Sequence, residues 1–144
     1  MTGERRLRVM VVDDHDVVHW GFRVMLGEQP WVERCLSART GAEVEALARR
    51  FEPHVALVDL FVGEESGAEV SQRLRAVSPG TSVLLISGAG RISAAAARAA
   101  GAAGFVPKEW PAADIADAVR MVGLGMTVFQ PPAVNQDPPV FPRG

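Results

Sequence analysis

The segment HVALVDL, residues 54–60, is an almost continuous apolar run that follows Pro53 and carries one carboxylate, Asp59, near its end. An apolar run of this length is typical of a parallel strand that is buried on both faces of its sheet. The segment therefore predicts a central strand, with Asp59 at the carboxyl end of that strand.

Four more segments of this kind lie along the chain, and helical patterns separate them. The expected strands are Leu7–Val12, Val32–Ser37, Ser82–Ser87 and the shorter GFVPK of residues 104–108. The expected helices are residues 16–28, Thr40 to about Phe51, the segment after Ser66 with Val70, Leu74 and Val77 on one face, the alanine-rich ISAAAARAAGA of residues 92–102, and Pro111 to about Leu124. This fivefold alternation predicts an α/β fold, a doubly wound parallel sheet with helices on both faces.

Local signals refine several of these elements. Thr40 followed three residues later by Glu43 predicts a capping box at a helix N-terminus. Pro107 lacks an N–H group and therefore predicts an edge position for the last strand. Pro111 predicts the first turn of the last helix. Trp20 and Trp31 are expected in the core or between helices.

Charge and hydropathy exclude several classes of protein. The 144 residues include 15 basic and 17 acidic side chains, a formal net charge of -2, which gives no indication of a DNA-binding surface or a polybasic membrane anchor. No stretch reaches the roughly 18 apolar residues of a membrane span, and the short apolar run near the N-terminus ends in two aspartates, unlike a signal peptide. The single cysteine, Cys35, excludes an intrachain disulfide. We therefore expect a soluble cytoplasmic protein with no membrane contact.

The composition changes beyond Gly125. Residues 126–144 hold five of the ten prolines of the chain. We expect one compact domain over residues 1–125 and a proline-rich linker or tail over residues 126–144.

Polar side chains gather where the predicted strands end. Asp13 and Asp14 follow the first strand, Asp59 ends the third, Ser87 ends the fourth and Lys108 ends the fifth. The carboxyl ends of parallel strands form one edge, where functional groups collect. Three carboxylates at that edge favour a hard divalent cation such as Mg²⁺. One of the carboxylates can then accept a phosphoryl group as nucleophile, while the metal ion, the lysine and the hydroxyl stabilise the transferring oxygens.

The same residues resemble the receiver domain of two-component response regulators over about residues 7–125. The matching pieces are VMVVDDHD, HVALVDL, Gly67, VLLISG and AAGAAGFVPK. The resemblance implies a flavodoxin-like sheet of five strands in the order 2-1-3-4-5. It also implies roles for individual residues: Asp59 as phosphoacceptor and metal ligand, Asp13 and Asp14 as the metal pair with Asp14 favoured as a direct ligand, the backbone carbonyl of Phe61 as a further ligand, Ser87 and Lys108 at the phosphate, and Phe105 at the aromatic switch position.

The sub-type and the departures from the family are also visible. The segments DDHDVVHWGFRVMLGEQP and AVRMVGLGMTVFQPP resemble receivers of the LuxR/NarL group, which precede a helix-turn-helix output domain that this chain lacks. Gly63 in the loop after Asp59, Pro107 before the lysine and Glu109 after it depart from the usual pattern. Glu64 and Glu65 are expected to be solvated rather than to add negative charge near the metal ion. His15, beside the acidic pair, is a candidate contact for the phosphate or the metal ion, but the more common solvent-facing position is expected.

The resemblance implies a switch driven by Mg²⁺-dependent phosphorylation of Asp59, which controls a transcriptional output and turns over no metabolite. The implied partners are a sensor histidine kinase, DNA only through the missing output domain, and a second copy, bound either through the fourth helix, fifth strand and fifth helix or through the first and fifth helices. One alternative is a phosphorylation-independent interaction module with the same fold. Another is an aspartate-based phosphohydrolase, which would leave Asp59 unexplained because its nucleophile ends the first strand.

Overall fold

The computed structural model describes residues 6–62, 65–87 and 94–129. Its elements are β1 (Leu7–Val12), α1 (Asp16–Gly27), β2 (Val32–Ala38), α2 (Gly41–Phe51), β3 (Val55–Asp59), β4 (Phe61–Val62), β5 (Glu65–Ser66), α3 (Gly67–Val77), β6 (Ser82–Ser87), α4 (Ala94–Ala99), β7 (Gly104–Pro107) and α5 (Ala112–Gly123). The main sheet has five parallel strands in the order β2-β1-β3-β6-β7. Counted within this sheet alone, the order is the predicted 2-1-3-4-5, so the fold prediction is confirmed.

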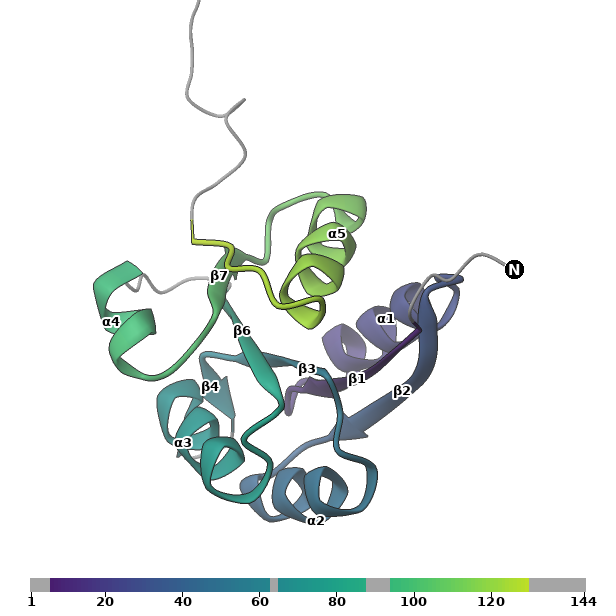
Figure 1. Ribbon diagram of the computed structural model, residues 1–144. Coiled ribbons are helices and arrows are strands. Elements are labelled where there is room, and N and C mark those ends of the chain that lie inside the picture. The colour runs from purple at the N-terminus through teal and green to yellow at the C-terminus, as the bar shows by residue number, and fades with distance from the viewer. Residues whose placement is uncertain (1–5, 63–64, 88–93, 130–144) are drawn as a thin grey trace, which may run out of the picture.

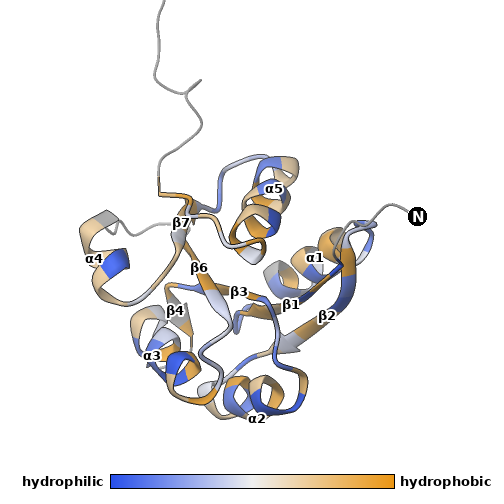
Figure 2. Cartoon of the chain, viewed as in Figure 1, coloured by the Kyte–Doolittle hydropathy of each residue, from blue (hydrophilic) through white to orange (hydrophobic). Residues whose placement is uncertain are grey.

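Helices cover both faces of the sheet (Figure 1). One face lies under α1 and α5, and the other lies against α2, α3 and α4. Successive residues of the central strands alternate between two buried clusters: Val55 and Leu57 join the α1 and α5 side, whereas Ala56 and Val58 join the other side. This alternation explains why HVALVDL is apolar at nearly every position. Figure 2 shows the same strands as the apolar centre of the molecule.

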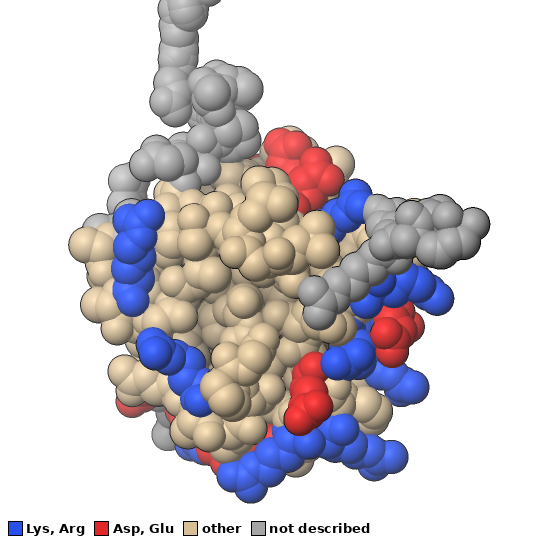
Figure 3. All heavy atoms as spheres, viewed as in Figure 1, with Lys and Arg blue, Asp and Glu red and all other residues tan. Residues whose placement is uncertain are grey.

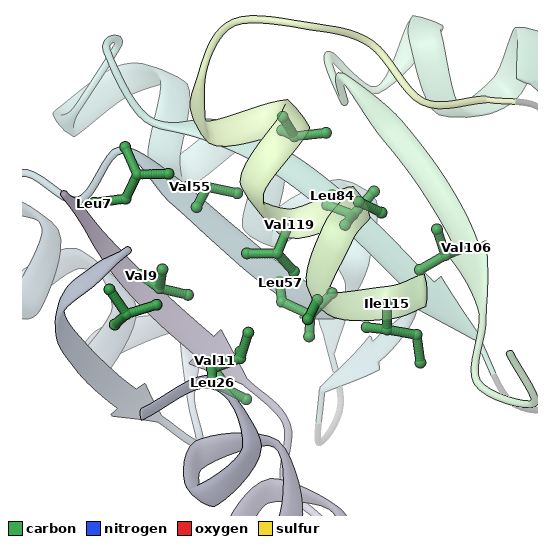
Figure 4. Packing of buried hydrophobic residues seen from close by; sticks show 14 of the residues in the cluster. Leu7, Val9, Val11, Leu26, Val55, Leu57, Leu84, Val106, Ile115 and Val119 are labelled. Atoms are coloured by element: carbon green, nitrogen blue, oxygen red, sulfur yellow. The ribbon is translucent and has the colours of Figure 1, made fainter. Parts of the chain in front are cut away.

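Figure 4 shows the cluster beneath α1 and α5 from close by. Leu57 of β3 and Leu84 of β6 meet Ile115 and Val119 of α5, and each of these side chains is at most 2 % exposed. Burying leucine and isoleucine side chains of this size contributes roughly 1.5–3 kcal/mol each. The cluster holds α5 against the centre of the sheet, and with it the end of β7 that precedes Lys108.

Two local predictions need correction. The Thr40 hydroxyl accepts a hydrogen bond from the Glu43 amide, but the Glu43 carboxylate accepts from the Arg39 amide at 2.7 Å, so the predicted capping box is only half formed. The complete box lies at α3, where Ser66 and Glu69 bond reciprocally. Pro111 occupies the N-cap of α5 and not its first turn, because its ψ of 145° is extended.

The structure also differs from the sequence expectations at Trp20 and at Glu65. Trp31 is buried, as predicted, but Trp20 is 66 % exposed on α1, so its predicted place in the core was wrong. Glu65 is not simply solvated, because its carboxylate accepts a hydrogen bond from the Arg73 guanidinium at 2.7 Å. Glu65 lies in a short antiparallel hairpin, β4–β5, that no sequence pattern had indicated. Gly63, Glu64 and the segment 88–93 of the fourth loop lie outside the described residues.

Gly67 is required by a close approach to the backbone of the strand that carries Asp59. A Cβ atom at this position would lie 2.8 Å from the Asp59 carbonyl oxygen and 3.0 Å from both Leu60 Cα and Leu85 Cδ2. The first of these distances is shorter than real Cβ contacts, so an alanine would displace the end of β3.

We expect Gly67→Ala to lower the free energy of unfolding by about 1–3 kcal/mol, the usual cost of overpacking. Urea denaturation measures this change. Gly80→Ala is the matched control, since a Cβ there meets nothing within 4 Å, and it should change stability by less than about 1 kcal/mol. A Gly67→Ala protein as stable as the parent would contradict this account of the turn after β3.

Candidate functional site

The sheet brings the predicted site residues to one edge. Asp13 and Asp14 follow β1, Asp59 is the last residue of β3, and Lys108 follows β7. The register of the strands aligns these ends, because Asp59 pairs with Ile86 and Ser87 pairs with Pro107. The convergence that the sequence predicted is therefore present in the structure.

An ion pair between Lys108 and Asp59 forms the centre of this edge. Lys108 Nζ donates to Asp59 Oδ2 at 2.6 Å and lies 3.5 Å from Asp13 Oδ2. Both carboxylates are almost fully buried, at 4 % exposed for Asp59 and 1 % for Asp13. Partial burial disfavours the ammonium, but the hydrogen bond to Asp59 and the charges of Asp13 and Asp59 outweigh it and raise the pKa of Lys108.

His15 adds a second basic group, which the sequence expectation had placed toward solvent. Its Nδ1 lies 3.0 Å from Asp13 Oδ1, 3.3 Å from Asp14 Oδ1 and 3.9 Å from Asp59 Oδ2, although the side chain is 64 % exposed. The hydrogen bond with Asp13, followed by the charges of Asp13 and Asp14, raises the pKa of His15. His15 is therefore exposed to solvent, as expected, while its Nδ1 faces all three carboxylates.

Hydrogen bonds from the surrounding backbone hold these groups in place. The imidazole of His19, which is buried, lies with Nδ1 2.6 Å from the carbonyl oxygen of Asp13. The Lys108 amide donates to the Ser87 carbonyl at 2.8 Å, and the Leu60 amide donates to the Ile86 carbonyl at 2.9 Å. The turn after β1 is thus tied to α1, and the ends of β3 and β7 are tied to β6.

The donor set suits a hard divalent cation. Single ligand atoms of Asp13, Asp14 and His15 all lie within 4.8 Å of one another. Asp13 Oδ2 is buried and accepts no hydrogen bond from the described residues, although Lys108 Nζ approaches it at 3.5 Å. A buried carboxylate oxygen of this kind is stabilised when a cation binds it, and carboxylate oxygens are the ligands that Mg²⁺ prefers.

The other predicted residues lie around this centre. Ser87 is buried at the end of β6, and Phe61 opens β4 two residues after Asp59. Phe105 lies in β7 and packs, half-buried, against the cluster on the α2, α3 and α4 side. Pro107 lies in β7, which is an edge strand of the sheet, as predicted.

The surface beside the site is apolar. A cavity of about 380 Å³ between α1 and α5 is lined by Val17, Gly21, Phe22, Met25, Lys108 and Ala112. On α1, Val17 and Trp20 are 82 % and 66 % exposed. On the face seen in Figure 3, basic side chains follow the margin over α2 and β2 with acidic ones among them, and the middle is uncharged.

Among the described residues, no helix combines the length and the apolar character needed to cross a bilayer.

Comparisons with known proteins agree with this geometry. Residues 9–120 match the family described as the response regulator receiver domain. The chain is 31 % identical over 126 residues to the response regulator protein VraR of Staphylococcus aureus (strain NCTC 8325 / PS 47), in an alignment that covers 87 % of this chain and 60 % of VraR. The chain therefore spans about three fifths of the length of the curated relatives it matches.

Solved structures show the same similarity. The signal receiver domain of the putative response regulator NarL from Mycobacterium tuberculosis superimposes with a TM-score of 0.73 at 32 % identity, over 84 % of this chain and 98 % of that one. A LuxR-family two-component response regulator from Aurantimonas sp. SI85-9A1 superimposes with a TM-score of 0.78 at 26 % identity, over 88 % of this chain and 91 % of that one.

Proposed function

The chain belongs to the response regulator receiver domain family, and from this premise we propose that it is a switch that accepts a phosphoryl group on Asp59 in an Mg²⁺-dependent reaction. The observation that carries the proposal is the buried Asp59 carboxylate, which bonds to Lys108 at 2.6 Å beside a second buried carboxylate, Asp13. A structural ion pair alone would not require three carboxylates at one edge of the sheet.

The residues at this edge can divide the chemistry among them. A carboxylate oxygen of Asp59 attacks the phosphorus atom of a phosphodonor, the bond from phosphorus to the donor's leaving group breaks, and an acyl phosphate forms. Lys108, already within hydrogen-bonding distance of Asp59, stabilises the negative charge on the transferring oxygens. Ser87, at the end of the neighbouring strand β6, would donate its hydroxyl to one of those oxygens.

Asp13, Asp14 and Asp59, together with the backbone carbonyl of Phe61, would hold the metal ion. The ion supplies positive charge that offsets the carboxylates and the incoming phosphoryl group. His15 already places a basic nitrogen against the same carboxylates, so its side chain has to share or yield this position when a cation binds. These assignments predict that phosphorylation fails when divalent cations are chelated.

The proposed partner is a sensor histidine kinase, and the proposed output is transcriptional. The similarity to VraR and to a LuxR-family two-component response regulator supports both, and the chain spans 60 % of VraR. The exposed apolar side chains Val17 and Trp20 on α1, beside the cavity at Lys108, give a protein partner a surface to contact near Asp59. Helix α1 forms, together with α5, one of the two surfaces proposed for a homodimer; the other consists of α4, β7 and α5. We propose the cytoplasm as the compartment. Residues 1–125 form the proposed receiver domain, residues 126–144 a linker, and the domain turns over no metabolite.

We expect incubation with phosphoramidate and Mg²⁺ to add one phosphoryl group to the chain, as measured by the intact mass. EDTA should abolish the adduct, because Lys108 alone does not offset the repulsion between three carboxylates and the incoming anion. No adduct on a folded protein would contradict the proposal and favour the phosphorylation-independent interaction module. Sustained phosphate release from a generic phosphate ester would instead indicate a phosphohydrolase.

A further inference from the structure

The chain does not leave the domain at the end of α5. The four residues Met126–Phe129, which we name the C-terminal strap, turn back to the outer edge of β7, where the yellow end of the trace passes in Figure 1. The Phe105 amide donates to the Val128 carbonyl at 2.8 Å, and the Val128 amide donates to the Ala103 carbonyl at 3.0 Å. The strap therefore satisfies backbone groups that an edge strand otherwise leaves to solvent.

Gly104 makes this pairing possible. A Cβ atom at residue 104 would lie 2.6 Å from the Val128 carbonyl oxygen and 2.8 Å from Leu84 Cδ1. The strap thus approaches β7 more closely than any side chain at that position would permit. Pro107 lies two residues after Phe105 and presents its nitrogen on the same outer side, where its missing N–H takes nothing from the pairing with β6.

The side chains of the strap connect it to α4 and to the aromatic position of β7. The Arg98 guanidinium of α4 lies over the Phe129 ring, 4.0 Å from its centroid, a cation–π contact. Phe129 and Phe105 pack against the same buried cluster. The strap therefore contacts β7, including Phe105, and α4. Phe105 is three residues from Lys108, the partner of Asp59.

We propose that the C-terminal strap is a clamp whose docking on β7 depends on the state of Asp59. This inference rests on the proposed function. Phosphorylation gives Lys108 a new anionic partner and thereby alters the end of β7. The two hydrogen bonds between the strap and the region of β7 connect this change to the C-terminal segment. If phosphorylation of Asp59 favours one arrangement of β7 and α4, it shifts the equilibrium between the docked and the released strap. By linkage, docking of the strap then changes the equilibrium of phosphorylation by the same factor. Release of the strap would change the position from which any following segment emerges.

The first test does not need phosphorylation. The amides of Phe105 and Val128 are bonded across the contact between the strap and β7, so their hydrogen exchange reports its opening. In the 144-residue chain, we expect Phe129→Ala to speed exchange at both amides at least tenfold. Leu124→Ala, which removes an apolar side chain that is 41 % exposed at the end of α5, should leave both rates unchanged. Equal rates in Phe129→Ala and the parent would overturn the role of the Phe129 contact.

The second test measures the same two amides after treatment with phosphoramidate and Mg²⁺, with the intact mass recorded on the same sample. We expect at least tenfold faster exchange at Phe105 and Val128 in the phosphorylated fraction, and a larger phosphorylated fraction in Phe129→Ala than in Leu124→Ala. A chain that carries the adduct but exchanges these amides at the original rates would overturn the clamp and leave the proposed function standing. A chain without any adduct would overturn both, and the mass separates the two failures.

Discussion

Asp59→Asn is expected to abolish the phosphoryl adduct while the protein stays folded. An amide cannot act as the nucleophile that a carboxylate provides, so the acyl phosphate cannot form at residue 59. Asparagine keeps nearly the same volume and an oxygen that can accept from Lys108 Nζ, so the packing at the end of β3 should be retained. Intact mass after treatment with phosphoramidate and Mg²⁺ measures the adduct, and circular dichroism confirms the fold.

The matched control for this variant is Asp117→Asn. Asp117 is an exposed aspartate on α5, outside the group of side chains around Lys108. Its replacement by asparagine changes the net charge by the same amount and should leave the adduct unchanged. If Asp59→Asn were phosphorylated to the same extent as Asp117→Asn, another carboxylate at this edge, such as Asp13 or Asp14, would be the acceptor.

Lys108→Met is expected to slow phosphorylation about 100-fold, the usual cost of removing one preorganised donor from a site of charge development. Methionine retains the apolar stem of lysine, which lines the cavity between α1 and α5, but it removes the charge that lies 2.6 Å from Asp59 and 3.5 Å from Asp13. The rate of adduct formation under saturating Mg²⁺ measures the effect.

A second measurement separates this role from general damage to the site. Because Lys108→Met removes a cation from among three carboxylates, the affinity for Mg²⁺ should stay the same or increase, which calorimetric titration can determine. Arg49→Met is the control, since Arg49 is an exposed basic residue in the last turn of α2. An unchanged phosphorylation rate in Lys108→Met would refute the assignment of Lys108, and a weaker affinity for Mg²⁺ would indicate that the variant had distorted the site.

The buried central strand and the convergence of Asp13, Asp59 and Lys108 at one edge could be predicted from local patterns, whereas the strand order was implied by the family resemblance. HVALVDL is apolar on both faces, as a strand covered by helices on both sides must be, and a parallel sheet brings the ends of its strands to one edge. A further signal lay in the composition: Lys108 is the only lysine among 15 basic residues. A chain that otherwise uses arginine throughout keeps its single flexible ammonium group beside Asp59.

The features that sequence patterns missed depend on contacts that no local pattern encodes. The sequence places His15 beside the acidic pair at the start of a helix, but its approach to all three carboxylates depends on the fold that brings Asp59 to them. Trp20 is exposed on α1, because the cluster beneath α1 is filled by residues such as Leu26. The pairing of Val128 with Gly104 joins positions 24 residues apart in a segment rich in proline and glycine.

Whether Asp59 is the acceptor is tested most directly by locating the phosphoryl group in the protein without amino-acid substitutions. Borohydride reduces an aspartyl phosphate to homoserine, and digestion with trypsin then places the candidate aspartates in different peptides. Cleavage after Arg50 and Arg73 yields a peptide in which Asp59 is the only aspartate. Asp13 and Asp14 lie in the peptide that follows Arg8. We expect homoserine at position 59 in the sample treated with phosphoramidate and Mg²⁺, and none in the EDTA-treated sample. Homoserine at position 13 or 14, with residue 59 unchanged, would contradict Asp59 as the acceptor.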